Sequence, residues 1–233
     1  MDARMHREEE PLSSSSTPTA PKLGFSFSAS GLMMPYHCGV GTALRDAGFL
    51  NDETPLSGSS GGAITAAAFA CGLPSHEIIN GIEAVAKDCR EKGSFRRMLI
   101  PARELCEKVL PEVLPRPKRL FIDKWDSKDD VVDSLMASSN IPAILAPSLL
   151  VRFRGGFCID GSFATKVGSF GCGDSAAERT VRVMAFDPKD FGGLARLISK
   201  AALTRDAIAP GLREGDSLPI STSRALRLAA GYQ

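Results

Sequence analysis

The spacing of apolar and polar residues along the chain predicts strands that alternate with helices. Residues 23–28 alternate strictly between apolar or small and polar side chains, which indicates a strand with one apolar face. A flexible turn follows at residues 29–31. Pro35 is then well placed to begin a helix that Gly48 ends. A strand, a turn and a helix in this order form the first half of a βαβ unit.

The remaining pattern continues this alternation to the end of the chain. Ser127 fits the N-cap of a capping box, and prolines interrupt the chain around residues 111–117. Helices are predicted over residues 36–47, 63–71, 75–92, 101–110, 131–138 and 194–203, and strands over residues 56–57, 120–122 and 180–186, with a hairpin over residues 149–159. This order favours an α/β fold with helices on both faces of the sheet.

Length and composition narrow the class of protein. The 233 residues suit one domain, and residues 1–21 are expected to be a disordered lead before a domain over residues 22–233. No apolar stretch is long enough to span a bilayer, and the first residues contain no apolar signal region, so an intracellular, cytoplasmic protein without a secretory signal is expected. The net charge of +1 argues against a nucleic-acid partner. Six scattered cysteines indicate reduced thiols, and no residue cluster predicts a metal or cofactor.

The most informative motif is Gly58-x-Ser60-x-Gly62, the pattern of a nucleophile elbow. In such an elbow a strand turns sharply into a helix, and glycines are needed on both sides where the two elements cross. The Ser60 hydroxyl would then point outward, and the N–H groups at the helix start would face a developing anion. The competing interpretation is a Ser/Gly turn that caps an ordinary helix.

The histidines argue against a Ser-His-Asp triad. An α/β-hydrolase places its histidine well downstream of the serine, but the chain contains only His6, His37 and His76. His6 lies in the expected disordered lead, and His37 is expected to face the core from its helix. His76 is expected to be a solvated residue in the first turn of a helix.

A carboxylate is therefore the expected general base, and Asp160 before Gly161 is the favoured candidate. Held in a partly desolvated cleft, an aspartate can accept a proton from a serine without a histidine relay. The alternative is an ordinary Asp-Gly turn. Asp123 and Asp126 also compete, although their lysine-rich surroundings indicate a solvated surface.

Four blocks, taken in order, resemble the patatin-like phospholipase family of lipid acyl hydrolases. They are residues 25–45 (Phe-Ser-Phe-Ser-Ala-Ser-Gly-Leu to Ala-Leu-Arg), the elbow at residues 58–63, residues 137–142 (Ala-Ser-Ser-Asn-Ile-Pro) and Asp160-Gly161. The resemblance implies a three-layer patatin-like sheet flanked by helices. It also implies a Ser60–Asp160 dyad that cleaves fatty-acyl esters of glycerolipids through an acyl-enzyme, in peripheral contact with a membrane or lipid droplet.

Two departures from that family keep other functions open. The glycine-rich oxyanion loop retains only Gly31, because Ala29 and Met34 replace its other glycines, so backbone N–H groups at Ser30, Gly31, Leu32 and Gly61 are the expected oxyanion donors. A core strand expected between residues 114 and 120 is replaced by a proline-rich stretch. A catalytically impaired lipid-binding protein is therefore an alternative, as is an acyltransferase that uses the same acyl-enzyme.

Overall fold

A parallel sheet forms the centre of the protein in the computed structural model. The structure describes residues 21–94, 97–110, 125–141, 144–165, 169, 171–186 and 206–210. Four strands, β1 (Leu23–Phe27), β2 (Leu56–Gly58), β5 (Arg179–Val183) and β6 (Ala207–Ile208), are arranged in the order β2-β1-β5-β6. Every pairing in this sheet is parallel, so the strands end at a common edge.

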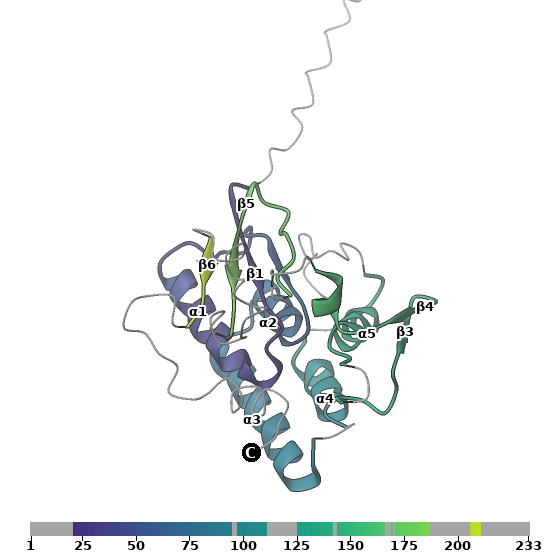
Figure 1. Cartoon of the computed structure of the whole chain (residues 1–233). Helices are drawn as coiled ribbons and strands as arrows, with labels where there is room; N and C mark the ends of the chain where they lie inside the picture. The colour runs from purple at the N-terminus through teal and green to yellow at the C-terminus, as the bar shows by residue number, and fades with distance from the viewer. Residues whose placement is uncertain are drawn as a thin grey trace, which may run out of the picture.

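Helices flank this sheet and confirm the predicted α/β class (Figure 1). The short 3₁₀-helix η1 (Gly31–Met33) leads into α1 (Met34–Asp46) after β1, and β2 leads into α2 (Gly61–Ala70). The later elements are α3 (Ser75–Lys92), α4 (Leu99–Val109), α5 (Lys128–Ser138) and the 3₁₀-helix η2 (Gly161–Ala164). None of the helices in the described ranges is both long and apolar enough to cross a membrane.

An antiparallel hairpin stands apart from the central sheet. Its strands β3 (Val151–Phe153) and β4 (Gly156–Cys158) pair only with each other in the described structure. Arg154 and Gly155 connect them with φ angles of 46° and 80°, as in the type I′ turns that suit the twist of a hairpin. The hairpin was predicted from the sequence, and in Figure 1 it lies at the edge of the molecule beside α5.

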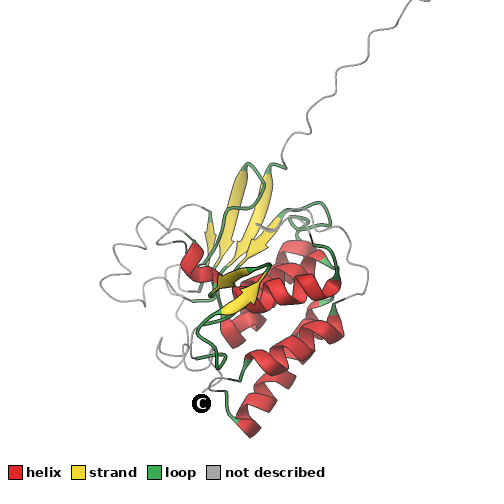
Figure 2. Cartoon of the chain, turned by 90° about the vertical axis from the view of Figure 1, so that its right-hand side faces the viewer, coloured by secondary structure: helices red, strands yellow, loops and turns green. Residues whose placement is uncertain are grey.

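The two faces of the sheet are covered differently. Phe25 and Phe27 on β1 face α1 and α2, where they pack with Leu56, Ala66 and Phe69 in one buried cluster. The helices therefore gather on this side of the strands (Figure 2). On the opposite face, the Ser57 hydroxyl donates to the Gly173 carbonyl over 3.5 Å. The helix predicted at residues 194–203 and the strand predicted at residues 120–122 lie outside the described residues.

A second cluster joins α2 to α5. Ala63 and Ala67 of α2 pack with Val132, Leu135 and Met136 of α5 in a buried apolar group. The predicted N-cap of α5 is confirmed, because the Ser127 hydroxyl accepts from the Asp130 N–H over 3.1 Å. Helix α2 therefore contacts the sheet on one side and α5 on the other.

The close crossing of β2 and α2 explains the two glycines of the elbow motif. A Cβ atom on Gly58 would lie 2.4 Å from the Gly62 carbonyl oxygen, and one on Gly62 would lie 2.3 Å from the carbonyl oxygens of Phe27 and Ser28. Because these neighbours are backbone atoms, no side-chain rotation could relieve the overlap. Only glycine fits at these two positions.

We expect Gly58→Ala to lower the free energy of unfolding by about 3 kcal/mol, because the added methyl group must displace the backbone of α2. Gly39→Ala is the matched control. A Cβ at Gly39 meets nothing within 4 Å, and this substitution inside α1 should stabilise the protein by about 0.5–1 kcal/mol. Urea unfolding of both variants tests the expectation, and equal stability of Gly58→Ala and the wild type would contradict it.

Candidate functional site

Ser60 sits on a strained turn between β2 and α2. Its φ and ψ angles are 52° and −131°, and only one other non-glycine residue in the described chain, Arg154, has a positive φ. Such a conformation costs a serine about 1–3 kcal/mol and persists only where the surrounding structure enforces it. Ser60 occupies the N-cap position of α2, but its side chain makes no capping hydrogen bond to the helix. The start of α2 therefore lacks the side-chain hydrogen bond that a capping serine would supply.

The starts of two helices meet beside Ser60. A Cβ on Gly61, the first residue of α2, would lie 2.6 Å from the Ser30 hydroxyl and 3.1 Å from the Gly31 nitrogen, at the start of η1. The first N–H groups of any helix have no acceptor within that helix. The structure thus brings the N–H groups of Gly31 and Gly61 into one neighbourhood, next to the serine.

The reduced glycine loop is compatible with this arrangement. Gly31 has a φ of 50°, whereas Met34 has the ordinary helical angles of −50° and −30°. Ala29 is not among the described residues with positive φ. Of the three positions, only the one that kept its glycine needs that residue for its backbone conformation, so the other two replacements cause no such strain.

Asp160 is buried two residues after the end of β4. Its side chain is 1% exposed, and Oδ1 accepts hydrogen bonds from the Ser162 N–H over 2.9 Å and from the Ser162 hydroxyl over 2.6 Å. This is the Asx turn that Asp-Gly dipeptides favour, and it caps η2. The second oxygen, Oδ2, is buried without a hydrogen-bond partner. Asp160 is therefore both a turn residue and a carboxylate with one oxygen left to accept a proton.

Two residues whose roles the sequence did not predict connect Asp160 to the elbow. The Ser138 hydroxyl accepts from the Ser60 N–H over 3.1 Å and would lie 2.7 Å from a Cβ on Gly161. The Asn140 carbonyl accepts from the Asp160 N–H over 2.8 Å, and the Asn140 side-chain amide donates to the Leu149 carbonyl over 3.4 Å. Both residues lie close together at the C-terminal end of α5, within the block of residues 137–142 that carries part of the family resemblance, but the sequence assigned neither of them a role.

The segments that contain Ser60 and Asp160 lie side by side, but the two side chains are not hydrogen-bonded to each other in the described structure. A Cβ on Gly161 would lie 3.2 Å from the Ser59 Cβ, so the residues following Asp160 and preceding Ser60 are in contact. No hydrogen bond joins the Ser60 hydroxyl to Asp160 in the described structure. Catalytic hydrogen bonds are often long before substrate binds, so this geometry fits a dyad that tightens on binding.

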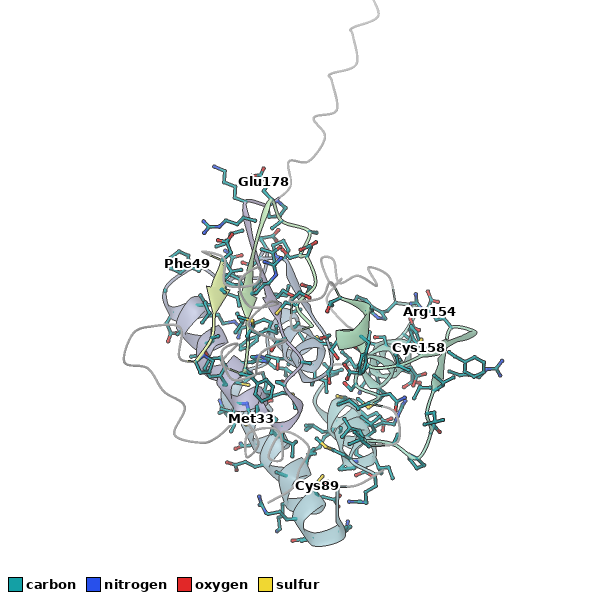
Figure 3. The ribbon with its side chains drawn as sticks, in the orientation of Figure 1. Met33, Phe49, Cys89, Arg154, Cys158 and Glu178 are labelled. Atoms are coloured by element: carbon teal, nitrogen blue, oxygen red, sulfur yellow. The ribbon has the colours of Figure 1, made fainter. Side chains whose placement is uncertain are left out.

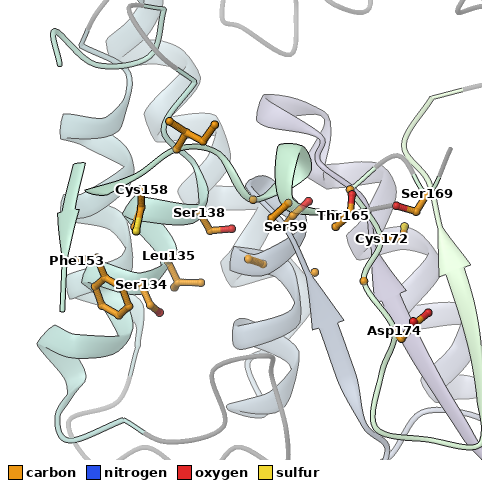
Figure 4. A pocket seen from close by; sticks show the side chains of 18 of the residues that line it. Ser59, Ser134, Leu135, Ser138, Phe153, Cys158, Thr165, Ser169, Cys172 and Asp174 are labelled. Carbon is orange, nitrogen blue, oxygen red and sulfur yellow. The ribbon is translucent and has the colours of Figure 1, made fainter. Parts of the chain in front are cut away.

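A cavity of about 520 Å³ lies beside the elbow and the Asp160–Gly161 turn (Figure 4). Its walls include Ser59 and Gly161, the sequence neighbours of the two candidate residues, but neither Ser60 nor Asp160 itself. The larger side chains that line it are mostly apolar, with a polar end at Asp174 and Arg182; the apolar ones are Trp125, Leu135, Phe153, Cys158 and Ile159. Its volume lies in the range of ordinary small-molecule sites.

His37 and His76 lie where the sequence predicted them, and His6 lies outside the described residues. His37 is buried between aromatic rings, with its ring centre 5.3 Å from that of Phe27 and its Nε2 3.5 Å from the Ser28 hydroxyl. Burial lowers the pKa of His37 to about 3, so the ring is neutral at physiological pH. His76 is exposed in the first turn of α3. Among the described residues, no hydrogen bond joins either histidine to Ser60.

The cysteines are free thiols, and the described residues contain no cluster that could hold a metal ion. All six cysteines are free, and burial raises the pKa of Cys106 and that of Cys172 to about 12. Within the described ranges, no group of three or more histidine, cysteine, aspartate or glutamate side chains is placed to hold a metal ion. Asp126, one competitor for the general base, is exposed as expected, and Asp123 lies outside the described residues.

Comparison with known proteins adds no family assignment: no protein-family model matches the chain, and no curated protein matches it. The resemblance to patatin-like phospholipases therefore stays a prediction that depends on the four sequence blocks and on the geometry of the site.

We expect Ser60→Gly to be more stable than Ser60→Ala by about 1 kcal/mol. Glycine adopts a positive φ without the penalty that a Cβ brings, so it relieves strain that alanine retains. Urea unfolding of the two variants measures the difference directly. Greater stability of the alanine variant would show that the turn is not strained.

Protonation of His37 should make stability depend on pH. Its pKa is lowered from 6.5 to about 3 in the folded chain, so below pH 6.5 the unfolded state binds one more proton than the folded state. Stability should therefore fall as the pH falls from 6.5 towards 3, with a contribution from this residue of about 1.4 kcal/mol per pH unit. Urea unfolding at several pH values should give a shallower slope for His37→Gln, and an unchanged slope would contradict the assignment.

Proposed function

We propose that the protein is a serine lipid acyl hydrolase of the patatin-like type, with Ser60 as nucleophile and Asp160 as general base. The observation that carries this proposal is the backbone conformation of Ser60, which has a φ of 52°. Ser60 lies between Gly58 and Gly62, and both positions need glycine because the strand and the helix cross so closely. Strained non-glycine residues of this kind gather at active sites. No histidine in the described structure is hydrogen-bonded to Ser60, which favours an aspartate as its base.

The proposed reaction proceeds through an acyl-enzyme. The Ser60 oxygen attacks the ester carbonyl carbon while its proton passes to Asp160 Oδ2, the oxygen without a partner. The negative charge on the former carbonyl oxygen is stabilised by N–H groups at Gly31 and Gly61, with Ser30 and Leu32 beside them. The intermediate then expels the alcohol, which takes the proton from Asp160. Water, deprotonated by Asp160, attacks the acyl-enzyme; the bond to the Ser60 oxygen then breaks, this oxygen takes the proton back from Asp160, and the fatty acid is released.

The cavity supports a fatty-acyl ester as substrate. Trp125, Leu135 and Phe153 give it apolar walls next to the elbow, where the acyl chain of a bound ester would lie. A phospholipid or triacylglycerol at a membrane or lipid-droplet surface is the proposed substrate class. At the other end of the cavity, the Arg182 guanidinium and the Asp174 carboxylate form an ion pair over 3.3 Å. This pair offers polar contacts to a bound substrate.

We expect Ser60→Ala and Asp160→Asn each to reduce fatty-acid release from phospholipid or triacylglycerol by about 10³-fold or more. Asparagine keeps an oxygen for the Ser162 hydrogen bonds, so the second variant removes the base with little change to the turn. Ser94→Ala is the matched control, because it removes a buried hydroxyl that has no hydrogen-bond partner and does not line the cavity. Undiminished hydrolysis by Ser60→Ala would refute the proposal.

A lipid-binding protein without hydrolytic activity is the second candidate. It is favoured by the reduced glycine loop and by the missing hydrogen bond between Ser60 and Asp160 in the described structure. A fluorophosphonate probe separates the two functions, because it forms a covalent bond only with an activated serine. Labelling of Ser60 in the wild type and in Ser94→Ala, with none in Ser60→Ala, supports the hydrolase. An unlabelled wild type supports the second candidate.

A further inference from the structure

Exposed apolar side chains gather in one part of the described chain, residues 144–163, which we name the hairpin segment. Large apolar residues are normally exposed singly, and a group of them marks an interaction surface. Six of the eight large apolar side chains that are exposed in the described residues belong to this segment: Ile144, Leu149, Leu150, Phe157, Ile159 and Phe163. Phe157 and Leu149 are the most exposed of its aromatic and aliphatic side chains, at 69% and 64%.

The hairpin within this segment has two different faces. Arg152 lies opposite Phe157 in the antiparallel register, and both side chains are exposed, with the guanidinium carbon 5.6 Å from the centre of the Phe157 ring. Phe153 and Cys158 belong to the other face and line the cavity. One side of the hairpin therefore faces the cavity, while the other presents a phenylalanine and a cation to solvent.

The charge exposed on the segment is positive. Its charged residues are Arg152, Arg154 and Asp160, of which Asp160 is buried. Arg154 forms an ion pair with Asp130 of α5, and the resulting hydrogen bond lowers the pKa of that carboxyl group. Arg152 remains on the outer face with Phe157. Apolar side chains that flank a cation are the composition with which proteins bind the interface of an anionic bilayer.

We infer that the outer face of the hairpin segment docks the protein on the surface of an anionic phospholipid bilayer. Phe157, Leu149 and Leu150 would enter the interface, and Arg152 would contact lipid phosphates. This inference deepens the proposed function and rests on it, because a glycerolipid substrate lies in such a surface. The inner face of the same hairpin lines the cavity, so docking here brings the cavity next to the lipid.

The test measures co-sedimentation of the full chain with vesicles of phosphatidylcholine containing about 30% phosphatidylserine, and with pure phosphatidylcholine vesicles. Leu149→Ser with Phe157→Ser should reduce partitioning to the anionic vesicles about tenfold. Arg152→Gln should reduce it about fivefold, with little effect on pure phosphatidylcholine. Thermal unfolding checks that the double variant is folded, and the exposed Arg152 gives an independent variant if it is not.

Phe49→Ser is the matched control. Phe49 is 57% exposed and lies far from Arg154 and Cys158, on the opposite side of the molecule (Figure 3). Binding should be unchanged in this variant. Equal loss in Phe49→Ser, or full binding by the double variant, would overturn the inference. A wild type that dimerises in sedimentation through the hairpin and does not bind vesicles would also overturn it, because a second copy would then cover the face.

Hydrolysis of a water-soluble butyrate ester separates failure of docking from failure of the proposed function. Hairpin variants should keep this activity, and Ser60→Ala should lose it while still binding vesicles. Vesicle binding that depends on the hairpin in a protein with no esterase activity would refute the proposed function alone. Normal esterase activity, together with vesicle binding that the hairpin substitutions do not change, would refute the docking surface alone.

Discussion

The close approach of α2 to the ends of β1 and β2 is the constraint on which the rest of the site depends. Gly58 and Gly62 let the backbones touch, and the three residues between them must reverse the chain within that space. Ser60 therefore takes a backbone conformation that serines otherwise avoid. The same crossing places the start of α2 against the start of η1. The nucleophile candidate and its nearby N–H donors are thus consequences of one packing contact.

Much of the framework could be predicted from the sequence because local patterns determine it. Helix α3 begins and ends at the residues that the periodicity predicted, and β1 differs from the predicted strand by one residue. The Ser127 cap was also predictable, since capping depends on residues three positions apart. The steric need for glycine at positions 58 and 62 followed from the elbow motif alone.

The surroundings of Asp160 were beyond sequence reasoning because they depend on contacts between distant segments. Ser138 reaches the Ser60 N–H across 78 positions of the chain, and Asn140 joins the two ends of a segment that encloses the hairpin. No periodicity marks such residues. The loss of two loop glycines also had a physical meaning that only backbone angles reveal, since Gly31 alone needs a positive φ. The cavity has the same origin, because its walls come from five separate stretches of chain.

The alanines between α2 and α5 have a consequence for the chemistry. Ser60 belongs to the start of α2, whereas Asp160 is fastened through Asn140 to the end of α5. The two candidate residues thus belong to segments attached to different helices. These helices are connected by the packing of Ala63 and Ala67 against α5 and by the hydrogen bond from the Ser60 N–H to Ser138. Each methylene added there would push the helices apart and so move the two candidate residues relative to one another. In the proposed hydrolase, the distance between Ser60 and Asp160 would therefore depend on how closely α2 and α5 pack, so a change in core volume at this contact would change the rate.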